Sequence, residues 1–131
     1  EDVVPFTKMT ACEHVGEQWN KEEEVADLAK LVADTKNALA FHGPLSVSID
    51  VPQSLYYYQS GVYDEAVDCG HLNSDLTHSV TLVGYDAEKD AFIIQNSWST
   101  AWGDNGAAYI KATGNVCGVA TTPLAVHVQK Q

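Results

Sequence analysis

Basic side chains are scarce in this sequence. Seven Lys and Arg residues stand against 18 Asp and Glu, so the formal net charge is -11. A surface with this charge repels nucleic-acid phosphates and anionic lipids, and we therefore expect neither nucleic acid nor a membrane as a partner. Long apolar runs are missing too, since none approaches the roughly 20 residues needed to span a bilayer. Residues 1–5 do not have the pattern of a signal peptide.

Cysteine is rare, and its count is odd. Cys12, Cys69 and Cys117 cannot all pair with one another, so one of them is a free thiol, a metal ligand or the partner of a cysteine in another chain. The spacings between them are too wide for a zinc knuckle. We therefore expect no metal site and no cofactor.

The rest of the composition is typical of a folded domain. Of the 131 residues, 45% are hydrophobic, which is enough for a core, and we expect a single domain over residues 1–131. Residues 1–20 have the pattern of an irregular, ordered loop, and the apolar spacing over 21–40 favours a helix. A shorter helix over 35–42, capped by Asp34, is an alternative for the end of this region.

Alternating apolar residues predict strands in the second half of the chain. Besides a hairpin within 76–98, the predicted extended segments are 45–51, 62–63, 107–112, 116–120 and 123–128. This order of elements favours an α+β fold with an antiparallel, β-barrel-like sheet and one or two short helices.

The hairpin within 76–98 carries the most informative pattern. Two β-branched, apolar runs flank the polar residues 86–90. If Tyr85 pairs with Ala91, then His78 and Asn96 are diagonal neighbours on one face, roughly 7–8 Å apart at Cβ. A shift of one residue in register would place them on opposite faces.

A histidine beside an asparagine amide has a known chemical use. An amide oxygen that accepts a hydrogen bond from one ring nitrogen fixes the tautomer and the angle of the imidazole. The other nitrogen can then exchange a proton with a nucleophile, as in a Cys-His-Asn set. The alternative is a partly buried histidine with a structural role only.

Five segments in this order resemble the C-terminal half of papain-like cysteine peptidases. Residues 43–50 (Gly-Pro-Leu-Ser-Val-Ser-Ile-Asp) resemble the family's Gly-Pro-Val-Ser-Val strand, and 58–63 resemble its Tyr-x-x-Gly-Ile-Tyr segment. Residues 77–85 resemble the strand that carries the catalytic histidine, and 96–106 the segment that carries the catalytic asparagine. Residues 116–118 (Val-Cys-Gly) resemble the last disulfide motif. The resemblance covers nearly the whole chain and implies a papain-like right-hand domain.

The resemblance also implies a role for each matched residue. His78 would be the general base and acid, Asn96 would orient it, and Trp98 would screen their hydrogen bond from water. Trp102 would line the leaving-group side of the cleft. The other implied substrate-binding residues are Ser48, Leu76, Thr77, Ser79 and Thr122. A specificity pocket with this lining would favour an apolar side chain two residues before the scissile bond.

The same resemblance gives each cysteine a structural place. It implies that Cys69 pairs with Cys117 and that Cys12 bonds to a cysteine in a separate N-terminal half. Such bonds imply an oxidising location: lysosomal, vacuolar or extracellular. The expected partners are therefore that N-terminal half and a peptide or protein substrate.

The chain departs from the family in ways that bear on activity. The catalytic cysteine and the oxyanion-hole glutamine are missing, while Thr77, Ser99 and Ala107 replace the residues usual at their positions. We therefore expect proteolysis only when another chain or segment supplies the nucleophile, and no activity from this chain alone. The alternative is an inactive homologue that serves as a peptide-binding or structural module. Retention of both His78 and Asn96 weighs against this alternative.

Overall fold

The computed structural model describes residues 6–14, 28–65 and 68–130. Its strands are β1 (Phe6–His14), β2 (Leu45–Ile49), β3 (Val62–Tyr63), β4 (His78–Asp86), β5 (Ala91–Gln95), β6 (Ala107–Lys111) and β7 (Leu124–Lys130). The α-helices are α1 (Leu28–His42) and α2 (Gln53–Tyr56), and short 3₁₀ turns cover Asn73–Asp75 and Val116–Gly118. In the described part of the chain, no helix is both long enough and apolar enough to cross a membrane.

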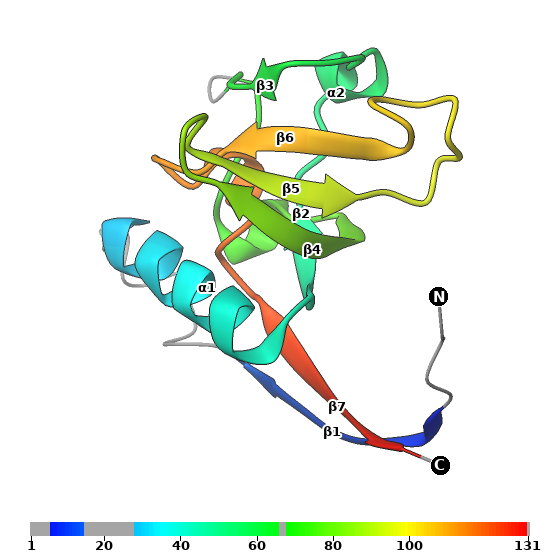
Figure 1. Ribbon diagram of the computed structural model, residues 1–131. Coiled ribbons are helices and arrows are strands. Elements are labelled where there is room, and N and C mark those ends of the chain that lie inside the picture. Colours follow the sequence, from blue (N-terminus) through cyan, green and yellow to red (C-terminus); the bar gives the residue numbers. More distant parts are fainter. Residues whose placement is uncertain (1–5, 15–27, 66–67, 131) are drawn as a thin grey trace.

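The strands form one open sheet. Its order is β1-β7-β2-β4-β5-β6-β3, with β1 and β3 at the two edges (Figure 1). All neighbours are antiparallel except β3 and β6, which run parallel. The α+β class is therefore correct, but the barrel-like closure is not confirmed, because the edge strands do not pair with each other. Two α-helices are present, as expected, but only α2 is short, with four residues, while α1 is 15 residues long.

The core lies against one face of the sheet. In β2, the buried side chains of Leu45, Val47 and Ile49 alternate with the outward-facing Ser46 and Ser48, as the period of a half-buried strand requires. Three residues of α1, which are Leu31, Val32 and Ala38, belong to the same buried cluster. The helix therefore covers part of the face opposite the two serines.

A single helix spans the region where two alternatives were open. Thr35 is buried within α1, and its hydroxyl donates a hydrogen bond to the Leu31 carbonyl 2.9 Å away. Asp34 lies in the helix interior, where it pairs with Lys30, so the predicted cap at Asp34 is wrong. The part of the predicted helix before Leu28 lies outside the described residues.

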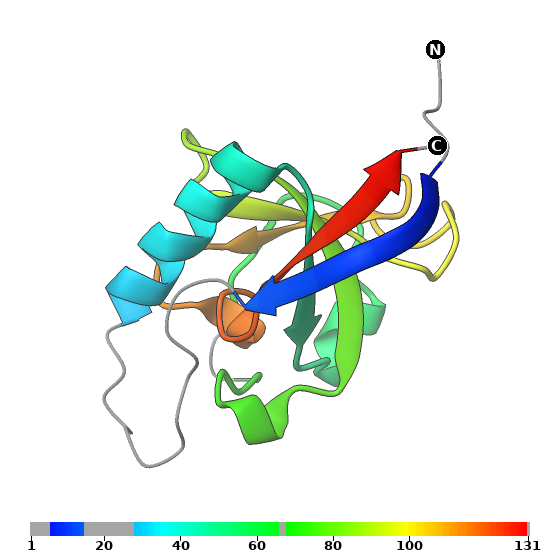
Figure 2. The ribbon, with the colours of Figure 1, turned by 90° about the horizontal axis from the view of Figure 1, so that it is seen from below.

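Two other segments differ from the sequence-based expectation. Residues 6–14 are a strand and not an irregular loop, because β1 pairs along its length with β7, more than a hundred positions later in the chain. These two strands form the long ribbon at the edge of the molecule (Figures 1 and 2). Residues 116–120 are not extended, since Val116–Gly118 form a 3₁₀ turn that Asn115 enters with a φ of 53°.

Candidate active site

The hairpin has the predicted register at its open end but not near its turn. Near its turn, Asp86 pairs with Ala91 and Tyr85 with Phe92, so the assumed pairing of Tyr85 with Ala91 is wrong. A bulge at Val83 then inserts one extra residue into β4, and beyond it Thr81 pairs with Gln95. That pairing is the one the assumed register gives at this end. The bulge therefore restores His78 and Asn96 to a common face.

His78 and Asn96 are joined by a hydrogen bond. Nε2 of His78 lies 2.8 Å from Oδ1 of Asn96, and the backbone N–H of Ser97 donates to the same oxygen over 2.7 Å. Because two donors converge on Oδ1, the amide is oriented with its oxygen toward the ring. Nε2 must then carry the proton, which leaves Nδ1 as the ring nitrogen that can accept one.

The Asn96 amide is buried at an energetic cost. The residue is only 7% exposed, and its Nδ2 atom has no hydrogen-bond partner among the described residues. A buried donor without a partner costs about 1–3 kcal/mol. The unsatisfied Nδ2 does not stabilise the fold, while Oδ1 of the same amide contacts the His78 ring.

Two indoles cover the pair. The Trp98 ring stacks on the His78 ring, with centroids 5.1 Å apart and planes 24° from parallel. Trp102 meets Trp98 edge to face at 5.1 Å, and it is itself 9% exposed with its Nε1–H donating to the Leu55 carbonyl. Trp102 therefore supports Trp98 and presents little of its own surface.

The residues implied for the specificity pocket come from neighbouring segments. Ser48 pairs with Ser79 across β2 and β4, and Thr122 lies two residues before the β7 residue that pairs with Ser46. The backbone N–H of Thr77 donates to the Ile49 carbonyl, which continues the β2–β4 ladder by one step.

Leu76 lies against the turn at Gly118. A Cβ added to Gly118 would come within 2.5 Å of the Leu76 Cδ2 atom. Since Gly118 also has a φ of +75°, this position requires glycine both for its backbone and for the space that Leu76 fills.

The sequence did not predict a hollow that lies on the outward face of the sheet. It is open, holds about 270 Å³, and reaches Asn96 from the hydroxyl-bearing face of β2 and β4. Its lining residues are Ser46, Ser79, Val80, Thr81, Gln95, Asn96 and Ser97. The alternation of polar residues in these strands is a sequence signal for such a polar face. In the structure, Ser46, Thr81 and Gln95 pair across three adjacent strands and form one row.

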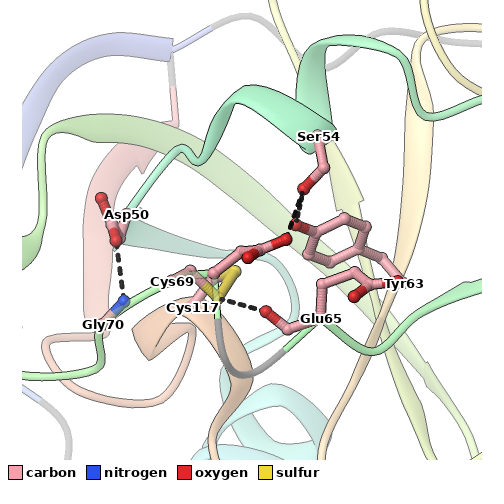
Figure 3. The surroundings of a disulfide bond; sticks show 8 residues. Asp50, Ser54, Tyr63, Glu65, Cys69, Gly70 and Cys117 are labelled. Carbon is pink, nitrogen blue, oxygen red and sulfur yellow. Dashed lines mark hydrogen bonds between the residues drawn. A yellow bond between two sulfur atoms is a disulfide. The ribbon is translucent and has the colours of Figure 1, made fainter.

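The structure joins Cys69 to Cys117, the pair that the resemblance implied (Figure 3). Asp50 connects this disulfide to the end of β2, because its N–H donates to the Cys117 carbonyl and its carboxylate accepts from the Gly70 N–H over 2.7 Å. The disulfide therefore fixes the 116–118 turn beside the strand that carries Ser48. Cys12 lies in β1, opposite Val126 of β7.

The turn end of the hairpin is held by a charged residue. Asp90 accepts hydrogen bonds from the Tyr85 hydroxyl and from the N–H and hydroxyl of Thr113, and Lys36 and Lys111 lie 4.0 and 3.9 Å away. The Thr113 hydroxyl, more than any other group, lowers the pKa of Asp90 below its ordinary value of 3.8. Within the described part of the chain, no three His, Cys, Asp or Glu side chains cluster as metal ligands would.

The α+β fold, together with a histidine, an oriented amide and a covering indole, is the arrangement found in papain-like proteases. The chain belongs to the papain family of cysteine proteases: residues 1–127 match the family described as "Papain family cysteine protease". It corresponds to the C-terminal part of its relatives.

Three relatives show what share of a papain-family protein this chain spans. The chain is 33% identical to the oryzain gamma chain of Oryza sativa subsp. japonica over 127 residues, which are 92% of this chain and 34% of that protein. It is 31% identical to pro-cathepsin H of Mus musculus, covering 92% of this chain and 37% of that one. The structure of digestive procathepsin L 3 of Tenebrio molitor larval midgut matches with a TM-score of 0.74 and 27% identity, covering 92% of this chain and 36% of that chain. The chain thus spans about a third of the length of these three relatives.

Proposed function

We propose that this chain is the histidine-bearing part of a cysteine peptidase that hydrolyses peptide bonds in peptides or proteins. Its His78 is the general base and acid, and Asn96 orients it. The observation that carries the proposal is the 2.8 Å hydrogen bond between His78 and an amide that is buried with one of its own donors unsatisfied. Family membership supports the reaction type.

The geometry assigns each ring nitrogen of His78 a task. Nε2 keeps its proton in the bond to Asn96, so Nδ1 takes the proton of a cysteine thiol and leaves a thiolate paired with an imidazolium. The thiolate attacks the scissile carbonyl, and the imidazolium returns its proton to the leaving amine. His78 then removes a proton from water as the water attacks the acyl-enzyme, and the thiolate that leaves pairs again with the imidazolium of His78.

The nucleophile comes from another chain or segment. Cys69 and Cys117 are bonded to each other, and Cys12 lies in β1, which β7 and β2 separate from β4 in the sheet. A base without a thiolate and an oxyanion hole gains little, so the chain by itself is expected to be inactive. We assign Cys12 to a disulfide with the part that supplies the nucleophile.

The hollow beside Asn96 supports this assembly. Six of its seven lining residues carry a hydroxyl or amide group, so a partner that packs here can form hydrogen bonds with them. The part carrying the nucleophile must reach His78, whose hydrogen-bond partner Asn96 lines this hollow. We propose that the N-terminal part of the protease packs here.

We propose that the main specificity pocket is formed by four residues, Ser48, Leu76, Ser79 and Thr122. The rest of the cleft is lined by Thr77, Trp98 and Trp102. The pocket would take an apolar side chain two residues before the scissile bond. The disulfide supports an oxidising compartment, which we assign as lysosomal, vacuolar or extracellular.

The test uses the protein isolated under native conditions. A peptide with an alkylating end group should label a cysteine outside these 131 residues, and reducing electrophoresis should release that polypeptide from Cys12. Substituting His78→Ala in the assembled protein should lower peptide hydrolysis about 10²- to 10⁴-fold. His42→Ala is the control, because His42 ends α1 and is exposed. An assembled protein with neither a labelled thiol nor hydrolysis would support the inactive, peptide-binding homologue instead.

A further inference from the structure

An additional aromatic side chain stacks on the indole that covers the candidate pair. The rings of Tyr56 and Trp98 lie with centroids 4.8 Å apart and planes only 7° from parallel. His78 stacks on the same indole at 5.1 Å. Trp98 is therefore the shared neighbour of Tyr56, in α2, and His78, in β4.

Stacking is what fixes the plane of the Trp98 ring. Among the described residues, its indole N–H has no hydrogen-bond partner, whereas the Trp102 Nε1–H is held by the Leu55 carbonyl at 3.0 Å. Trp98 is followed by Ser99, which has a φ of 76° and is exposed, so the chain on that side offers little packing. Without a polar anchor, the orientation of the indole depends on its ring neighbours.

Tyr56 is well placed to supply this constraint. The preceding residue, Leu55, is fully buried, and its carbonyl accepts the bond from Trp102. Two residues later, the Tyr58 hydroxyl donates to the Gly61 carbonyl over 2.6 Å and accepts from the Tyr109 N–H. The short helix α2 is thus anchored on both sides of Tyr56, although the ring of Tyr56 is itself 56% exposed.

We propose that Tyr56 is a positioning residue that acts through Trp98. Its ring holds the indole against His78, and the indole in turn keeps water from the bond between His78 Nε2 and Asn96. Tyr56 touches neither His78 nor Asn96 in this role. Any effect of Tyr56 on peptide hydrolysis rests on the proposed function. The positioning of the Trp98 ring by Tyr56 is a property of this chain and can be measured without an activity assay.

The experiment compares three variants of the protein, each isolated under native conditions, by nuclear magnetic resonance. Tyr56→Ala removes the ring, Tyr56→Phe keeps it, and Tyr57→Ala is the matched control, because Tyr57 is 74% exposed and makes no ring contact among the described residues. Two quantities are followed: the ring-current shifts of the carbon-bound His78 protons, and the exchange of the His78 Nε2 proton with water. Denaturant unfolding of each variant records changes in global stability separately.

An aromatic pair of this kind contributes enough to predict about a 2- to 12-fold faster exchange of the Nε2 proton in Tyr56→Ala. The His78 carbon-bound protons should move toward their unstacked shifts in the same variant. Tyr56→Phe and Tyr57→Ala should match the unaltered chain in both measurements. Unchanged His78 shifts in Tyr56→Ala, or equal effects of Tyr56→Ala and Tyr57→Ala, would overturn the proposal. Neither result would bear on whether His78 is the base of a peptidase.

Discussion

Two buried asparagines should respond very differently to truncation. In Asn96→Ala, the two hydrogen bonds to Oδ1 are lost, which costs about 1–3 kcal/mol in total. The same substitution removes the buried Nδ2 that has no partner among the described residues, which returns about 1–3 kcal/mol. The two effects oppose each other, so we expect the free energy of unfolding to change by less than about 2 kcal/mol in either direction.

Asn115 is the matched control for this prediction. It is 1% exposed, and both ends of its amide are satisfied, since Nδ2 donates to the Thr121 hydroxyl at 2.9 Å and Oδ1 accepts from the Ala120 N–H at 2.7 Å. Asn115→Ala removes both bonds, leaves the Ala120 donor buried, and places alanine at a φ of 53°. Nothing offsets these losses, so we expect a destabilisation of about 2–4 kcal/mol.

Urea unfolding followed by circular dichroism measures both variants under the same conditions. The expected result is a midpoint close to that of the unaltered chain for Asn96→Ala and a clearly lower one for Asn115→Ala. If Asn96→Ala were as destabilising as Asn115→Ala, the amide of Asn96 would be a stabilising element. The inference that Asn96 is retained to orient His78 would then be wrong.

Three further predictions concern the frame around the site. Replacing Cys69 and Cys117 by alanine removes a cross-link across 48 residues and should lower the free energy of unfolding by about 4 kcal/mol in the chain-entropy model. A loss below about 1 kcal/mol in a urea titration would contradict this prediction. Asp90→Asn should destabilise the chain at neutral pH. Because folding lowers the pKa of Asp90, its contribution to the free energy of unfolding is present above pH 3.8 and is lost as the pH falls through the pKa of the folded state. A difference in the free energy of unfolding between the variant and the unaltered chain that stays constant down to acid pH would refute this account. Because Ser99 has a φ of 76°, Ser99→Gly should be about 1 kcal/mol more stable than Ser99→Ala in thermal unfolding, and equal stabilities would show that the turn relaxes to another conformation.

The departure at Ser99 also bears on the family pattern. The papain-like motif that this segment resembles has glycine at this position, and the left-handed φ of the turn gives a physical reason for it. Ser99 tolerates it with its Oγ accepting a hydrogen bond from the Ala101 N–H at 3.2 Å. A non-glycine residue at this φ strains the turn, and the His78–Asn96 bond forms in its presence.

The sequence by itself determined the features that depend on local pattern and on ordered motifs. The alternation in β2, the hairpin within 76–98 and the resemblance to papain-like peptidases could all be read from it. Each rests on residues that are near one another in the chain, or on several motifs whose order is hard to produce by chance.

Tertiary structure decided what depends on partners distant in sequence. Residues 6–14 become a strand only because β7 supplies its hydrogen bonds, and the edge positions of β1 and β3 leave the sheet open. The bulge at Val83 corrects a register that the turn alone would have set one residue off. The stack of Tyr56 on Trp98 joins residues 42 positions apart, and no local pattern encodes such a contact, because it forms only when a one-turn helix is packed against the loop after β5.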